Sequence, residues 1–112
     1  MDWFNSEYYH ILYRNRDNKE AKTFINNIIK KLDLKTGLKV LDLACGKGRH
    51  STYLEKLGFI VTGIDKSINN IINARENENE NLNFLNKEMI DDLDGKYDAI
   101  FNLFTSFTKK SL

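Results

Sequence analysis

The stretch Leu38-Lys39-Val40-Leu41-Asp42-Leu43-Ala44-Cys45-Gly46-Lys47-Gly48-Arg49-His50-Ser51 decides the fold of this chain. Its residues 40–43 are a short apolar run with one acid, which is typical of a buried parallel strand. Small residues and one lysine follow, and from Arg49 a helical pattern begins, with Tyr53 and Leu57 on one face. The stretch therefore predicts a strand, a tight loop and a helix whose unpaired N–H groups point at a ligand close to the loop.

The spacing of this loop, Asp42-x-Ala44-x-Gly46-x-Gly48, resembles the first motif of the class I S-adenosylmethionine (SAM)-dependent methyltransferases. Members of that family often have glycine where this chain has Ala44. Dinucleotide-binding Rossmann domains have a related loop, but their Gly-x-Gly-x-x-Gly fingerprint is not met, because Ser51 stands at its last position. The resemblance covers nearly the whole chain and weakens after Phe107.

Composition narrows the class of protein. The chain has 112 residues, enough for one domain at most, and 41% of them are hydrophobic, so it can build a core. A net charge of +1 gives no electrostatic case for nucleic acid or an anionic membrane as partner. A single cysteine excludes an internal disulfide, and no Cys/His cluster predicts a metal. Without a signal peptide or a long apolar run, we expect a soluble, cytoplasmic protein.

A second acid stands where a nucleotide-like cofactor needs one. Residues 59–64 are an apolar, β-rich run, and Asp65 follows them, 17 residues after Gly48. A carboxylate about 20 residues past a glycine-rich loop accepts the ribose hydroxyls in nucleotide sites. Two features at matched spacing are a stronger signal than either alone. We therefore expect Asp65 at the ribose, with Lys66 beside it in the cofactor site.

The resemblance implies further cofactor contacts. Residues 82–89 are predicted as a third strand ending in Glu88-Met89, the acid–apolar pair that holds the adenine in the family, where Asp is usual in the first place. Residues 97–104 are predicted as a fourth strand, with Asn102 at the carboxyl end, where open α/β sheets bind ligands. No proline follows Asn102, unlike in members that methylate exocyclic amino groups of DNA bases, which argues against that substrate class.

The resemblance thus implies SAM as the cofactor and a small molecule as the acceptor of the methyl group. The expected cofactor-binding set is Asp42, Ala44, Cys45, Gly46, Gly48, Asp65, Lys66, Glu88, Met89 and Asn102. Asp42 either fixes the loop by accepting backbone N–H bonds or lies near the SAM amino group. Cys45 lies at a helix N-terminus, which can activate a thiol, but a small residue tolerated in a tight loop is the favoured interpretation. No residue is assigned as a catalytic base.

Residues 1–35 precede the first of these strands as an N-terminal helical cap. The aromatic segment 3–13 predicts a short helix, and simple packing on the sheet is its favoured role. The alternative is a flap over the ligand, with Tyr8, Tyr13 and Arg16 as candidate contacts. A second helix is expected from Lys19 to just before Thr36-Gly37, on the rhythm of Phe24, Ile25, Ile28, Ile29 and Leu32.

The family fold is a seven-stranded sheet of order 3-2-1-4-5-7-6, and only four strands are predicted here. We therefore expect an α/β, Rossmann-like three-layer sandwich with a partial parallel sheet of order 3-2-1-4. Residues 36–112 would be the N-terminal half of a methyltransferase domain. The fourth strand would then be an exposed apolar edge, which predicts marginal stability or self-association. A truncated, inactive remnant or a SAM-binding module without turnover is the alternative function. A nucleotide-dependent oxidoreductase is the second alternative, disfavoured by the loop spacing.

Overall fold

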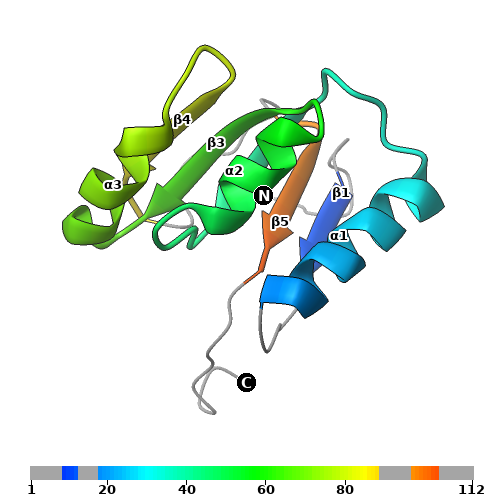
Figure 1. The fold of residues 1–112 in the computed structure, drawn as a ribbon, viewed down its shortest axis with the longest axis horizontal. Coiled ribbons are helices and arrows are strands. Elements are labelled where there is room, and N and C mark those ends of the chain that lie inside the picture. Colours follow the sequence, from blue (N-terminus) through cyan, green and yellow to red (C-terminus); the bar gives the residue numbers. More distant parts are fainter. Residues whose placement is uncertain (1–8, 13–17, 89–96, 104–112) are drawn as a thin grey trace.

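The computed structural model describes residues 9–12, 18–88 and 97–103, which form one parallel sheet with helices packed against it (Figure 1). The strands and helices are β1 (Tyr9–Leu12), α1 (Asn18–Leu32), β2 (Lys39–Leu43), α2 (Arg49–Lys56), β3 (Ile60–Asp65), α3 (Ile68–Ala74), β4 (Leu82–Asn86) and β5 (Ala99–Asn102). A short 3₁₀ turn, Arg75–Asn77, continues α3. The Rossmann-like α/β fold class is the predicted one.

The strand order is β1-β5-β2-β3-β4, and every neighbouring pair is parallel. The four strands that the sequence predicts are, in chain order, β2, β3, β4 and β5. Read from the other edge of the sheet they are arranged β4-β3-β2-β5, so the predicted order 3-2-1-4 is confirmed. In the register, Asp42 of β2 lies between Gly63 of β3 and Phe101 of β5. Because all strands run the same way, their carboxyl ends meet at one edge of the sheet, where the arrowheads gather in Figure 1.

The prediction of a helix over residues 3–13 is wrong for the part that the structure describes. Tyr9–Leu12 is strand β1, which pairs with β5 from Tyr9↔Ala99 to Leu12↔Asn102. Tyrosine and isoleucine favour strands, and the N–H and C=O groups along β5 gain partners from this pairing, so tertiary contact overrides the local helical pattern. The prediction of β5 as an exposed edge is also wrong, and self-association through it loses its basis.

The helices cover one face of the sheet, where the larger core cluster lies (Figure 1). Ile25 of α1, Leu54 of α2 and Ile71 of α3 share this cluster with alternate strand residues. The intervening strand residues form a second buried cluster, Leu41, Leu43, Ile64 and Ile100. Burial of both kinds of position explains why apolar residues follow one another directly in β2 (Val40, Leu41) and β5 (Ala99, Ile100, Phe101) rather than alternating with polar ones.

Helix α1 supplies the predicted N-terminal helix, with nearly the predicted ends. It begins at Asn18 and ends at Leu32, before Thr36-Gly37 as expected. Asp33 then adopts a left-handed conformation (φ 54°), and the Leu34 N–H donates to the Ile29 carbonyl at 2.9 Å. This is a C-terminal cap in which a left-handed residue lets the chain satisfy the last carbonyls and turn toward β2.

The outer edge of β4 is closed by the segment that precedes it. The Phe84 N–H donates to Glu78 Oε2 at 2.8 Å, and the Phe84 carbonyl accepts from Arg75 Nε and Nη2, both at 3.4 Å. Leu82 and Asn79 exchange two backbone hydrogen bonds, of 3.0 and 3.2 Å. Since these backbone groups already have partners, this stretch of the edge offers little to an added strand.

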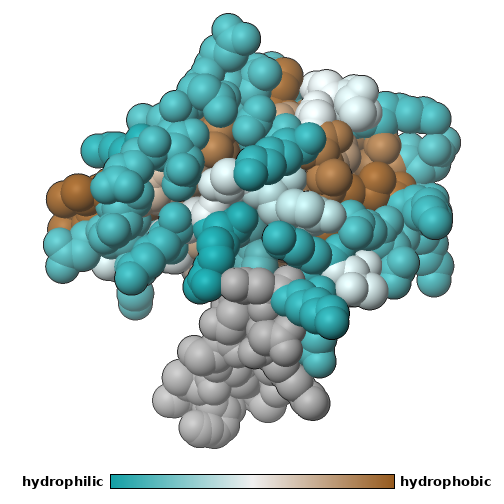
Figure 2. Space-filling view, in the orientation of Figure 1, coloured by the Kyte–Doolittle hydropathy of each residue, from teal (hydrophilic) through white to brown (hydrophobic). Residues whose placement is uncertain are grey.

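The surface in this view is mainly hydrophilic, with apolar colour in separate patches (Figure 2). The exposed large apolar side chains among the described residues are Ile60, Ile68, Ile72 and Leu85. Within ranges 9–12, 18–88 and 97–103, no helix has both the length and the apolar character that a membrane crossing requires.

Candidate functional site

The described members of the predicted cofactor set lie where β2, β3, β4 and β5 end. The loop 44–48 joins β2 to α2, Asp65 is the last residue of β3, and Asn102 is the last residue of β5. Lys66 and Glu88 are exposed, next to the ends of β3 and β4. Parallel topology thus brings together residues that are up to 60 positions apart, from Asp42 to Asn102. Met89, Tyr8, Tyr13 and Arg16 lie outside the described residues.

The loop passes through the left-handed region at alternate positions. Ala44, Gly46 and Gly48 have φ angles of 55°, 61° and 85°. A Cβ on Gly46 would have nothing within 4 Å, so the space above this residue is open to an approaching ligand. A Cβ on Gly48 would lie 2.6 Å from Cζ of Phe84, so this glycine instead allows close packing of the loop on the core. The spacing of small residues therefore has two separate physical causes.

Ala44→Gly is expected to stabilise the chain by ~0.5–1 kcal/mol. An L-residue with a Cβ is strained at φ 55°, and glycine relieves this strain although it adds freedom to the unfolded chain. Urea unfolding of the two chains measures the difference. Ala74 has an ordinary helical φ of −63° and is fully buried, so Ala74→Gly is the matched control and should destabilise. Destabilisation by both substitutions would contradict the explanation.

Asp65 holds the glycine loop and the start of α3 together. Its Oδ1 accepts from the Gly46 N–H at 3.1 Å, and its Oδ2 accepts from the Ser67 N–H at 3.0 Å. Its backbone carbonyl accepts from the Lys87 N–H at 3.1 Å, which ties β3 to the end of β4. Ser67 is the N-cap of α3. The glycine-rich loop and the acid at the end of β3 are therefore in direct contact, although Gly46 and Asp65 are 19 residues apart in the sequence.

Asp42 faces α2 beneath the loop and is 2% exposed. Its Oδ2 accepts from the Ser51 hydroxyl at 2.6 Å. Burial raises the pKa of Asp42 to about 7; the Ser51 hydrogen bond opposes this, and the nearby charge of Asp65 adds to it. The loop N–H of Gly46 donates to Asp65 rather than to Asp42, so Asp65 performs the first of the two roles predicted for Asp42.

Cys45 has the surroundings of a packing residue. It is half-buried against the core cluster on the helix-covered face. Burial raises the pKa of its thiol well above the ordinary value, and the negative charges of Asp42 and Asp65 raise it further. A thiol of this kind stays protonated and unreactive at neutral pH. The structure therefore supports the interpretation of Cys45 as a small residue that fits a tight loop.

Asn102 contributes an acceptor to the same edge. Its side-chain oxygen is buried and has no hydrogen-bond partner within the part of the chain that the structure describes. A buried polar atom without a partner is uncommon, and at the mouth of a parallel sheet it is suited to a donor group on a ligand. The sequence indicated a cofactor role for Asn102 but none for Ser51 or Asn70, the side chains that contact the two acids.

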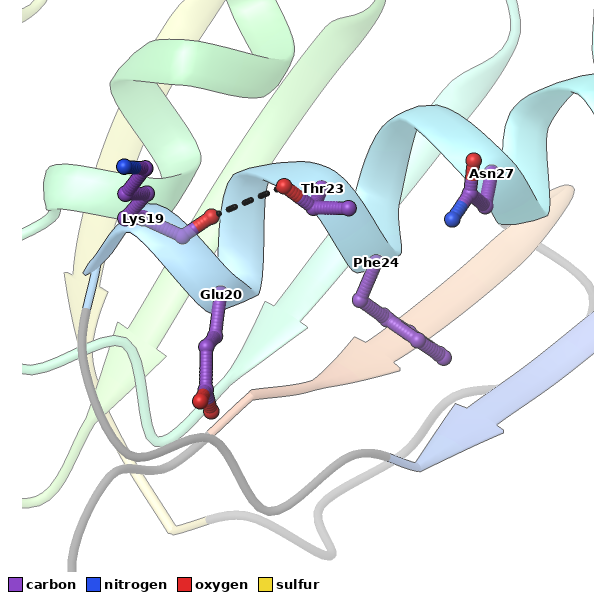
Figure 3. A pocket seen from close by; sticks show the side chains of 5 residues that line it. All are labelled: Lys19, Glu20, Thr23, Phe24 and Asn27. Atoms are coloured by element: carbon purple, nitrogen blue, oxygen red, sulfur yellow. Dashed lines mark hydrogen bonds between the residues drawn. The ribbon is translucent and has the colours of Figure 1, made fainter.

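A separate hollow of about 420 Å³ lies along α1 (Figure 3). Its lining includes Lys19, Glu20, Thr23, Phe24 and Asn27, and the Thr23 hydroxyl donates to the Lys19 carbonyl at 3.2 Å. None of these residues belongs to the glycine loop or to the predicted cofactor set. The candidate cofactor site is therefore defined by the acids and the loop at the sheet edge.

Comparison with known proteins identifies relatives of one kind. The family model described as tellurite resistance protein TehB matches residues 4–108. A probable S-adenosyl-L-methionine-dependent methyltransferase TehB of Haemophilus influenzae is 54% identical over 46 residues, which are 40% of this chain and 16% of that protein. A glycine/sarcosine N-methyltransferase of Halorhodospira halochloris is 34% identical over 94 residues, 79% of this chain and 35% of that protein.

A solved structure agrees in fold. Magnesium protoporphyrin IX methyltransferase (ChlM) from Synechocystis PCC 6803 with bound SAM has a TM-score of 0.63 and 24% identity, over 75% of this chain and 42% of that one. The chain thus spans less than half of the length of each of these relatives. The relatives from Haemophilus influenzae and Halorhodospira halochloris are both described as methyltransferases, which favours this predicted family over the oxidoreductase alternative.

Proposed function

This chain belongs to the TehB family of class I SAM-dependent methyltransferases, and we propose that its sheet edge binds SAM for methyl transfer to a small-molecule acceptor. The observation that carries the proposal is the contact between Asp65 and Gly46. A ribose-type carboxylate and a glycine loop, held 3.1 Å apart, form the two halves of a nucleoside site. The relatives named above are methyltransferases, two of them described with SAM.

The residues at the carboxyl ends of the strands suit different parts of the cofactor. The open side of Gly46 lets the methionine part approach the backbone, and the N-terminus of α2 favours its carboxylate. The side-chain oxygen of Asn102, which has no partner among the described residues, can accept from the ammonium group of SAM. Asp65 would accept from the ribose, and Glu88 with Met89 would hold the adenine. We assign these site residues to the cofactor, and we assign no described residue to the acceptor.

The chemistry needs alignment more than activation. Bound SAM would supply a sulfonium-activated methyl group for transfer to a nitrogen, oxygen or carbon nucleophile of the acceptor, with the thioether as the leaving group. This chain would bind and orient SAM through Asp65 and the glycine loop, so that the reacting atoms meet at low entropic cost. A catalytic base is not needed from these residues if the acceptor itself arrives unprotonated.

The proposal is tested by calorimetric titration of the chain with S-adenosylhomocysteine. We expect binding in the micromolar range, weakened ~10–100-fold by Asp65→Ala, because hydrogen bonds to a charged group are lost. Gly46→Ala should weaken binding at least as much, since its Cβ would occupy the open approach to the loop. No binding by the folded chain, or saturation by NADH instead, would contradict the proposal.

Gly37→Ala is the matched control for Gly46→Ala. Both glycines have positive φ angles, 90° and 61°, and a Cβ on either would have nothing within 4 Å. Both substitutions therefore strain the backbone without a clash, but Gly37 lies before β2, at the opposite end from the loop. Binding that is equally weak in both variants would indicate general strain rather than a blocked site.

A further inference from the structure

Within the part of the chain that the structure describes, three hydrogen bonds fix the Asp65 carboxylate, and one of them comes from a side chain. Oδ1 accepts from the Gly46 N–H at 3.1 Å, and Oδ2 accepts from the Ser67 N–H at 3.0 Å. The third donor is Nδ2 of Asn70, 3.3 Å from Oδ2. The first two are main-chain N–H groups, which any residue except proline would supply. The Asn70 contact therefore depends on the identity of the side chain.

Among residues 9–12, 18–88 and 97–103, these donors leave one acceptor position of the carboxylate without a partner. A carboxylate has about four acceptor positions, two on each oxygen. Oδ2 uses both of its positions for Ser67 and Asn70, while Oδ1 uses one for Gly46. The remaining position is on Oδ1, the oxygen beside the glycine loop. The terminal torsion of an aspartate is broad, so the orientation of the two oxygens depends on such partners.

We propose that Asn70 is a positioning residue for the cofactor, which holds Asp65 so that Oδ1 presents its vacant acceptor to a ribose hydroxyl. This inference rests on the proposed function. Asn70 is half-buried on the first turn of α3, and its own N–H donates to the Ser67 hydroxyl at 3.2 Å. That main-chain bond places Asn70 whatever its side chain is, so its amide can be removed without loss of the N-cap.

Binding of S-adenosylhomocysteine by Asn70→Ala tests the inference. We expect ~5–10-fold weaker binding, because the carboxylate loses a donor and part of its fixed orientation. Asn70→Gln, which keeps an amide donor, should recover part of the affinity. Asn69→Ala is the matched control, since Asn69 is an exposed neighbour on the same turn. Thermal melts of all variants should agree closely with that of the parent chain.

Analogues that lack the 2′ or the 3′ hydroxyl separate positioning from a structural role. With the analogue that lacks the hydroxyl held by Asp65, the loss caused by Asn70→Ala should shrink to nearly none. An equal loss for S-adenosylhomocysteine and both analogues, or no loss for any, overturns the inference while the proposed function stands. Absence of binding by the parent chain overturns both.

Discussion

Gly48→Ala is expected to destabilise the chain by ~3 kcal/mol, because it combines backbone strain with a steric clash. Gly48 has a φ of 85°, which a residue with a Cβ rarely adopts. Its Cβ would also lie 2.6 and 2.8 Å from Cζ and Cε1 of Phe84 and 3.1 Å from Cβ of Ala74. For a domain of this size, such a loss is a large part of the total stability.

The Phe84 ring has no room to move away from a new Cβ at position 48. The ring is 1% exposed, and a Cβ on Gly63 would meet it from another direction at 2.7 Å. The ring therefore lies against two glycines, one in the loop and one in β3. This packing links the cofactor loop to the core, since a displaced ring would press on β3 next to Asp65.

Urea unfolding of Gly48→Ala and Gly46→Ala separates the clash from the strain. Gly46→Ala has the same kind of positive φ but no atom within 4 Å of the new Cβ, so it should cost only ~1 kcal/mol. In a Phe84→Leu background, the smaller side chain should reduce the cost of Gly48→Ala. Equal losses at positions 46 and 48 would show that the ring is not the obstacle.

The strand–loop–helix and the acid at the end of β3 could be predicted because their signals are local. The loop needs small residues wherever the backbone is left-handed or closely packed, and those residues appear at alternate positions from Ala44 to Gly48. The strand order 3-2-1-4 came from the family resemblance, and the structure agrees with it.

Other features depend on contacts between distant residues and could not be predicted locally. Strand β1 exists through its pairing with β5, about 90 residues later in the chain, and an aromatic segment alone does not indicate such a partner. The hydrogen bond from Ser51 to Asp42 depends on the angle at which α2 crosses β2.

Asn70, by contrast, could have been predicted from the sequence, because it lies three residues after the N-cap Ser67, within the first turn of α3 above Asp65.

Asp42, the first residue of the loop motif, makes the stability of the chain depend on pH. The pKa of Asp42 is 3.8 without perturbation and about 7 in the folded chain. The folded state thus favours the protonated acid, and this contribution to stability is fully present below about pH 4. It is lost progressively as the pH rises from about 4 to about 7, because the acid then ionises in the unfolded chain while it stays protonated in the folded chain. At about 1.4 kcal/mol per pKa unit, the loss is ~4 kcal/mol.

Asp42→Asn is expected to remove this loss, since the amide is always neutral and can still accept from Ser51. The variant and parent chains should have similar unfolding free energies near pH 4, and the variant should become increasingly more stable up to about pH 7. Two further variants should shift the upper end of this range in opposite directions. Ser51→Ala removes the hydrogen bond that lowers the pKa of Asp42, so the pH at which the loss is complete should rise. Asp65→Asn removes a charge that raises the pKa of Asp42, so this pH should fall. Urea unfolding from pH 4 to pH 8 measures all four chains, and parallel curves for parent and Asp42→Asn would refute the buried, neutral acid.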